Sequence, residues 1–237
     1  MVHGDGAITT VAVTGRLRLA DAAPMRETLL KCLAEQPGAL LIDLSGLDVE
    51  QPLALAVFTA VLHQAARWPG TPVLLCAPPP ATREHLVTGA YQRMPLFDTL
   101  ARARDHLRDS RLTMPAISEE LLPVSGSTRH ARNVATEVCL RWDLPGLVAP
   151  ASLIVTELVA NVVDHARTMM TLRLSLRPRH LNIAVRDGAP GEPVEMKPPP
   201  PASPARGRGL LLVSSVAANW GWLPSHDGKV VWAALRR

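Results

Sequence analysis

The stretch from Glu157 to His165, E-L-V-A-N-V-V-D-H, constrains the second half of the chain most strongly. At about 100° per residue, its polar side chains fall on one arc of a helix and its leucine and valines on the opposite arc. Glu157 can accept a proton or orient a water, and the amide oxygen of Asn161 can complete the oxygen shell of a hard cation such as Mg²⁺. An ordinary amphipathic helix with a polar solvent face is the alternative interpretation of this segment alone.

Length and composition indicate two domains with aliphatic cores. A chain of 237 residues suits two domains of about 110 to 120 residues. Hydrophobic residues make up 47% of the chain but aromatic residues only 3%, which favours layered α/β architectures built from Leu, Val, Ala and Ile. Three cysteines, Cys32, Cys76 and Cys139, lie far apart in apolar segments, so we expect reduced core thiols and neither disulfides nor a zinc site.

The sequence also bears on the localisation of the protein and on whether it binds membranes or nucleic acids. We find no run of about 18 apolar residues and no leader-like N-terminus, so we expect a soluble, cytoplasmic protein with no membrane association. The formal charge is +4, but the arginines are scattered and no aromatic platform accompanies them. We therefore expect no direct binding of nucleic acid.

The first half alternates strands and helices, which predicts a mostly parallel sheet with right-handed crossovers. Asp21 is expected to cap the first helix, and Gly15 to end the first strand. The expected elements, in order, are strand 8–14, helix 21–34, strand 39–44, helix 53–67, strand 72–77 and helix 82–88.

This order, with the phrase L-L-I-D-L-S-G-L-D-V (Leu40 to Val49), resembles the STAS domain of sulphate transporters and anti-sigma-factor antagonists. The resemblance covers roughly residues 5 to 108, and we place the domain at residues 1–110. In antagonist members, a partner kinase phosphorylates a serine that begins the helix after this strand. Here that segment reads Gln51, Pro52, Leu53, Ala54, so we predict no phosphoacceptor at the usual site. Glu50 is either a fixed mimic of phosphate charge or a solvated loop carboxylate.

A charged and proline-containing stretch separates the two halves. We place a linker at residues 111–121 and the second domain at residues 122–237. Ser127 is expected to cap a helix that runs to about Trp142. Alternating residues over 171–176 and 181–185 predict an antiparallel hairpin.

Two further motifs follow the hairpin. Asp187 leaves the second strand within D-G-A-P-G, where a carboxylate can accept a hydrogen bond from an exocyclic amine and glycines let the backbone approach a planar base. R-G-R-G-L (Arg206 to Leu210) opens an apolar helix, and such a turn offers free N–H groups and arginines to an anion. Taken singly, these are also consistent with an Asp-Gly turn and a Gly-Arg linker.

Three motifs follow one another in the second half: E-x-x-x-N, D-G-x-x-G and R-G-R-G-L. Their order resembles that of the GHKL ATPases, and most closely that of the anti-sigma-factor serine/threonine kinases. The closing pattern, W-G-W-L-P followed by D-G-K-V-V-W, resembles the same family. The resemblance implies a Bergerat-fold α/β sandwich with an antiparallel or mixed sheet that binds ATP and Mg²⁺. Glu157 would be the catalytic base, Asn161 the Mg²⁺ ligand and Asp187 the adenine contact; the role of His165 stays open. The implied cofactor-binding residues are Asn161, Asp187, Gly191, Gly207, Arg208, Gly209 and Leu210.

The sequence departs from this family in two places. Ala189 replaces the middle glycine of the usual Asp-x-Gly-x-Gly box. The segment between the D-G-A-P-G and R-G-R-G-L motifs, which would form the lid over the nucleotide in this family, is rich in proline. This composition favours a stiff polyproline II segment over a freely closing flap. Its prolines are Pro193, Pro198 to Pro201 and Pro204.

Three functions are consistent with these patterns. The leading hypothesis is a cytoplasmic protein serine/threonine kinase of the anti-sigma type that acts on a STAS antagonist and so controls a sigma factor and transcription. The alternative is a catalytically weak nucleotide-binding adaptor in a partner-switching pathway. A sensor histidine kinase is the third, although the first half has no clear phosphoacceptor-histidine helix. The expected partners are a STAS antagonist, a sigma factor or both, and a homodimer is left open.

Overall fold

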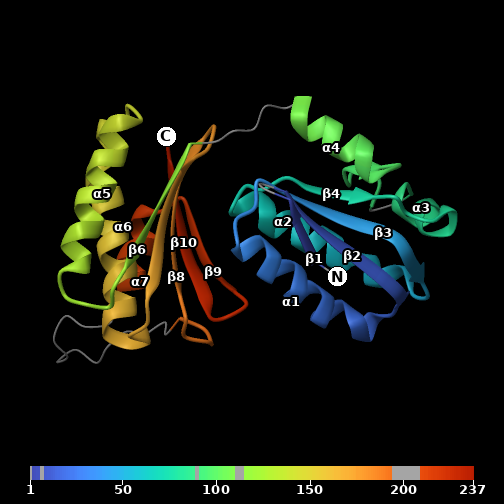
Figure 1. Cartoon of the computed structure of the whole chain (residues 1–237), viewed down its shortest axis with the longest axis horizontal. Coiled ribbons are helices and arrows are strands. Elements are labelled where there is room, and N and C mark those ends of the chain that lie inside the picture. Colours follow the sequence, from blue (N-terminus) through green and yellow to red (C-terminus); the bar gives the residue numbers. More distant parts are fainter. Residues whose placement is uncertain (1, 6–7, 89–90, 110–114, 194–208) are drawn as a thin grey trace. The chain divides into compact units, whose positions relative to one another are not determined.

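The chain folds into two compact units, Met1–Thr113 and Met114–Arg237 (Figure 1). The computed structural model describes residues 2–5, 8–88, 91–109, 115–193 and 209–237. Each unit has its own five-stranded sheet, and the two are described separately.

The sheet of the first unit has the strand order β1-β2-β3-β4-β5, with β2 to β5 parallel and β1 antiparallel to β2. The predicted mostly parallel sheet is confirmed. Its central strand β3 begins with four residues at most 2% exposed, Ala39 to Ile42, because helices cover this part of a parallel sheet on both faces. The strands are β1 Val2–Asp5, β2 Ile8–Leu17, β3 Ala39–Val49, β4 Val73–Cys76 and β5 Leu96–Phe97. The helices are α1 Leu19–Ala34, α2 Ala56–Arg67, α3 Pro80–Leu86 and α4 Leu100–Asp109.

Three local expectations for the first unit are corrected. Gly15 does not end β2: the strand continues past an irregularity between Ala12 and Thr14, and Gly15 takes a positive φ of 93° within it. Asp21 is not the N-cap of α1 but its third residue, and its carboxylate accepts the Arg18 N–H at 3.0 Å. The second helix begins as a separate 3-10 turn, Pro52–Leu55, before α2.

The sheet of the second unit is antiparallel throughout, in the order β6-β7-β8-β10-β9. The predicted hairpin is confirmed as β7 and β8. Helices α5, α6 and α7 lie on one face of this sheet (Figure 1), and their apolar sides and the facing strand residues form one core. The strands are β6 Ala116–Leu121, β7 Met170–Leu176, β8 His180–Asp187, β9 Asn219–Pro224 and β10 Lys229–Arg236. The helices are α5 Ser127–Arg141, α6 Val148–Asn161 and α7 Gly209–Val216.

Two expectations for the second unit are corrected. Residues 116–121, assigned to the linker, form the edge strand β6, whose exposed and half-exposed residues alternate and include Glu119 and Glu120. Charged residues are common on edge strands because they oppose pairing with another chain, so this strand looks like a linker in the sequence. The N-cap of α5 is Gly126, not Ser127. The Ser127 hydroxyl instead donates a hydrogen bond to the Leu122 carbonyl at 2.6 Å.

The helical stretch Pro145–Ala166 is long and apolar enough to cross a membrane by length and composition alone. This corrects the expectation that the chain has no such stretch. Core helices of soluble proteins pass the same test, and α6 within this stretch contributes five buried residues to the core of the second unit. They are Ala151, Ile154, Val155, Leu158 and Val159.

Candidate functional site

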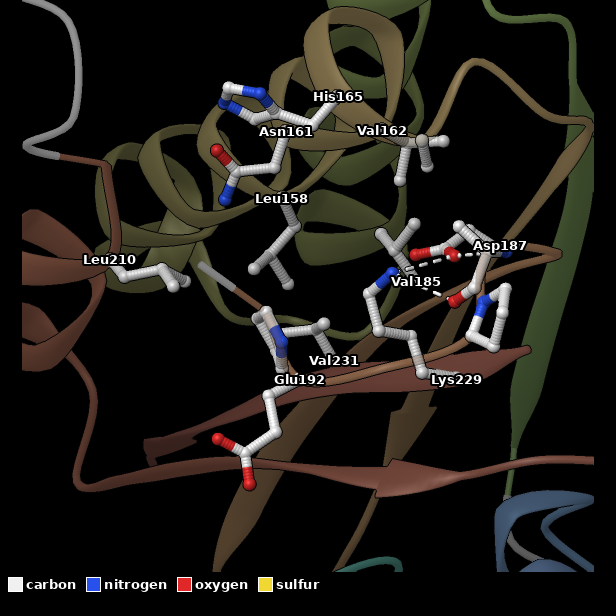
Figure 2. A pocket seen from close by; sticks show the side chains of 14 residues that line it. Leu158, Asn161, Val162, His165, Val185, Asp187, Glu192, Leu210, Lys229 and Val231 are labelled. Atoms are coloured by element: carbon white, nitrogen blue, oxygen red, sulfur yellow. Dashed lines mark hydrogen bonds and ion pairs between the residues drawn. The ribbon is translucent and has the colours of Figure 1, made fainter. Parts of the chain in front are cut away.

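A pocket of about 200 Å³ lies in the second unit where the end of α6, the loop after β8, the start of α7 and β10 meet (Figure 2). Its walls are aliphatic and include Leu158, Val185 and Val231. Polar groups gather at a few points of this apolar surface, which is the usual composition of a small-molecule site. The polar and charged side chains that line it are Asn161, His165, Asp187, Glu192 and Lys229.

The end of α6 brings the first predicted residues to this pocket. Asn161 is the last residue of α6, is half-buried and lines the pocket. The next five residues, Val162–Ala166, form a π-helical turn, so the predicted row does not continue as one regular α-helix. His165 is exposed but lines the pocket, whereas Asp164 is exposed and is not among its lining residues.

Glu157 and Asn161 face the first residue of α7. A methyl group placed on Gly209 would lie 2.6 Å from Glu157 Oε2 and 3.6 Å from Asn161 Oδ1. Both oxygens therefore lie beside the backbone of Gly209, next to the pocket, although Glu157 itself is not among the residues that line the pocket. Leu210, one residue further along α7, lines the pocket and is 8% exposed.

The remaining predicted phosphate-binding residues, Gly207 and Arg208, lie outside the residues that the structure describes. The same holds for most prolines of the predicted lid, Pro198 to Pro201 and Pro204. The lid interpretation therefore stays a prediction.

Asp187 forms the polar floor of the pocket. Its side chain is only 2% exposed, and its Oδ1 accepts hydrogen bonds from the Ala189 N–H at 2.8 Å and from Lys229 Nζ at 3.0 Å. Lys229 Nζ also donates to the Ala189 carbonyl at 3.0 Å. Figure 2 shows the carboxylate and the ammonium turned toward each other at this end of the pocket.

The loop after Asp187 is fixed by its own backbone contacts. The Gly188 N–H donates to Thr168 Oγ1 at 2.9 Å, and Ala189 is tied to Asp187 and Lys229 as described. Gly191 has a φ of +99°, a conformation that favours glycine, so its role here is to turn the backbone. Pro190 and Pro193 of the same loop line the pocket, whereas Gly191 is not among the lining residues.

The turn before β10 positions Lys229. Arg186 donates to Asp227 at 2.7 Å, and this hydrogen bond and the Arg186 charge hold the pKa of the Asp227 carboxyl below its usual range. Gly228 follows, and a methyl group there would lie 2.8 Å from the Gly188 backbone. The turn thus packs directly on the loop that carries Asp187.

Sequence reasoning missed Lys229, Gly228 and Thr168 as parts of the site. Lys229 lies directly opposite Asp187 in the antiparallel pairing of β8 and β10. The only sequence signal for it was the D-G-K that opens the last strand, 42 residues after Asp187, and only the strand register turns that signal into a contact.

The side chains present fit a nucleotide with Mg²⁺. No group of three or more His, Cys, Asp or Glu side chains placed to hold a metal occurs among the described residues. Mg²⁺ is commonly held by one or two protein oxygens together with substrate phosphates, and the Asn161 amide oxygen beside the start of α7 could be such an oxygen. The apolar walls and the buried Asp187 suit a planar base with an exocyclic amine.

Two family models each match a part of the chain. Residues 124–235 match the histidine kinase-like ATPase domain family, and residues 1–90 match the Mlab, STAS domain family. No curated protein matches the chain.

Several solved structures resemble part of the chain. An anti-sigma factor antagonist from Mycobacterium paratuberculosis is 27% identical, with a TM-score of 0.41, over 46% of this chain and 92% of that one. RsbS from Moorella thermoacetica is 21% identical, with a TM-score of 0.40, over 46% and 95% of the two chains. The anti-sigma factor antagonist SpoIIAA in its unphosphorylated form is 12% identical, with a TM-score of 0.39, over 46% and 96%.

Proposed function

The chain joins a STAS domain to a histidine-kinase-like ATPase domain, and on this basis we propose that it is a cytoplasmic protein serine/threonine kinase of the anti-sigma-factor type. Its substrate would be a serine or threonine of a separate STAS antagonist, and the outcome would be control of a sigma factor and of transcription. The domain pair itself supports a partner-switching regulatory protein, and the ATPase domain implies ATP binding.

One observation supports the kinase proposal: Glu157 Oε2 and Asn161 Oδ1 both lie beside the start of α7, next to the pocket that Asp187 lines. In this proposal, Asp187 accepts the exocyclic amine of adenine and the aliphatic walls exclude water from the base. Asn161 holds Mg²⁺, which supplies positive charge for the phosphates when it is bound. Glu157 accepts the proton of the substrate hydroxyl, since its half-buried carboxylate lies next to the metal-binding amide.

Glu157→Gln tests the proposal. We expect phosphate transfer to a STAS antagonist to fall by at least about 100-fold, because the amide cannot take the proton. Affinity for Mg·ATP should stay within about threefold, because Glu157 does not line the pocket. Transfer is measured with radiolabelled ATP and affinity by calorimetry.

Glu137→Gln is the matched control. Glu137 is ion-paired with Arg141 on the surface of α5, with 67% of its side chain exposed, so this variant should transfer phosphate normally. Equal transfer by the Glu157 and Glu137 variants would contradict the role of Glu157.

A second candidate, a nucleotide-binding adaptor with little transferase activity, is favoured by the first unit. By the resemblance to STAS antagonists, the segment that would carry the acceptor serine is Gln51 to Ala54, none of which has a hydroxyl. It overlaps the turn Pro52–Leu55, where Leu53 is 72% exposed. Such a domain can bind a partner but cannot be switched by phosphate at this position. Wild-type protein that binds Mg·ATP yet phosphorylates none of a panel of STAS antagonists would favour the adaptor.

A further inference from the structure

We propose that Lys229 makes the pocket accept 6-oxopurine nucleotides, such as ITP and GTP, in addition to ATP. The inference rests on the proposed function in one respect, that the pocket binds a purine nucleotide. It goes further in two ways. It assigns the choice of base to one residue, Lys229, and it adds 6-oxopurine nucleotides to the ligands of the pocket.

The first observation is that the ammonium of Lys229 has donor capacity left for a ligand. An ammonium carries three N–H donors. Two are used, toward Asp187 Oδ1 and toward the Ala189 carbonyl, both at 3.0 Å. Lys229 lines the pocket with a side chain 11% exposed, so its remaining donor can serve a ligand in the pocket with little competition from bulk water.

The second observation concerns the two oxygens of Asp187. Oδ1 accepts both the Ala189 N–H and Lys229 Nζ, which fills its two lone pairs. Among the described residues no hydrogen bond uses Oδ2, so this oxygen is available as an acceptor. The floor therefore offers an acceptor from Asp187 and a cationic donor from Lys229 side by side (Figure 2).

This pairing suits both kinds of purine edge. Adenine offers an amine donor at position 6 beside the N1 acceptor, and Asp187 can accept from that amine whether or not Lys229 is present. A 6-oxopurine reverses the edge, with an acceptor at O6 and a donor at N1. A carboxylate alone would repel O6, but a lysine beside it can donate to O6, which together with N7 is the acceptor that Lys and Arg most often contact on guanine.

Burial makes this difference measurable. The Asp187 side chain is 2% exposed and the pocket walls are aliphatic, so an unpaired O6 facing the carboxylate would lose its hydrogen bonds to water without replacement. A ligand that leaves a buried polar group of the site unpaired is rejected strongly, and O6 would leave the Asp187 carboxylate without a donor. Lys229 removes this penalty for 6-oxopurines.

The test compares the dissociation constants of Mg·ITP and Mg·ATP for the full chain by calorimetric titration. The two nucleotides differ only at the 6-position and N1, so the ribose and phosphate contacts cancel in the ratio. We expect wild-type protein to bind ITP within about tenfold of ATP. ATP binding with ITP weaker by more than about tenfold would overturn this inference and leave the proposed function standing, whereas binding of neither nucleotide would overturn both.

Lys229→Met should raise the ITP-to-ATP ratio at least about tenfold, because methionine keeps the length of the side chain but cannot donate to O6. Lys229→Arg keeps a cation beside Asp187, so the buried carboxylate stays paired and we expect the variant to fold. Its ITP-to-ATP ratio should stay within about threefold of wild type. Lys31→Met removes a more exposed ion pair, to Glu27 at 2.8 Å in α1 of the first unit, and should not change the ratio. A Lys229→Met protein that binds both nucleotides with the wild-type ratio would overturn the role of Lys229.

Discussion

At the scale of single residues, Gly228 is the position where the site tolerates least change. A methyl group there would lie 2.8 Å from the Gly188 backbone and would also overlap the Asp187 carbonyl, and neither backbone atom can move without shifting the loop under the pocket. We therefore expect Gly228→Ala to lower the free energy of unfolding by about 1–3 kcal/mol and to weaken ATP binding. Urea denaturation and calorimetry measure the two effects.

Gly146→Ala is the control for this prediction. Apart from its chain neighbours and the backbone of its own helical turn, no described residue lies within 4 Å of a methyl group placed on Gly146. The free energy of unfolding and the ATP affinity of Gly146→Ala should therefore stay close to wild type. A Gly228→Ala protein as stable as the control would contradict the close packing of the two loops.

Also at this scale, the sequence predicted the chemistry of the site better than its contacts. Asn161, Asp187 and Leu210 were expected to share one site because of motif order, and all three line one pocket. Lys229 was not expected there, because its contact with Asp187 depends on the register of β8 with β10. Register follows from long-range pairing and a shift of one residue turns the side chain to the other face, so a short D-G-K motif does not reveal it.

At the scale of elements, apolar periodicity predicted most strands and helices, and polar elements were misassigned. The apolar run Ala39 to Ile42 predicted the buried start of β3, because a strand that is covered on both faces has apolar residues at successive positions. Edge strand β6 was taken for a linker because it carries charged residues, as edge strands often do, and has no continuous apolar run. The π-helical turn Val162–Ala166 was missed because no periodicity distinguishes it from the α-helix before it.

Helix α6 provides a test at the element scale, since its composition alone would also suit a membrane. Ile154 on α6 is fully buried in the core of the second unit. We expect Ile154→Ala to lower the free energy of unfolding in water by about 2–5 kcal/mol, because it removes packed methyl groups and leaves a cavity. Leu140→Ala on α5, where the leucine is 59% exposed, should change it by less than about 0.5 kcal/mol.

Tryptophan fluorescence during urea denaturation measures this effect, since four of the five tryptophans lie in the second unit. Equal stability of the Ile154 and Leu140 variants would show that α6 is not a core helix of a water-soluble domain.

At the scale of the whole molecule, each of the two units contains at least one buried cysteine, whose reaction rate can report the opening of that unit. Cys32 and Cys76 are buried in the first unit and Cys139 in the second, all as free thiols. Burial raises the pKa of Cys76 to about 12 and that of Cys139 to about 11, with the nearby Asp43 adding to the effect on Cys76. At pH 8 the native thiols therefore carry almost no thiolate, and labelling by a disulfide reagent requires local or global opening.

This arrangement predicts which unit the nucleotide stabilises. The pocket is lined only by residues of the second unit, so ligand binding should stabilise that unit alone. With Mg·ATP at 100 times its dissociation constant, the stabilisation is about 2.7 kcal/mol, and labelling of Cys139 at pH 8 should slow by about 100-fold. Cys32 and Cys76 should keep their rates, as measured by mass spectrometry of the labelled peptides, and in urea all three thiols should react independently of ATP. Equal slowing of Cys76 and Cys139 would show that the two units open as one, and an unchanged Cys139 would show that the pocket does not bind the nucleotide.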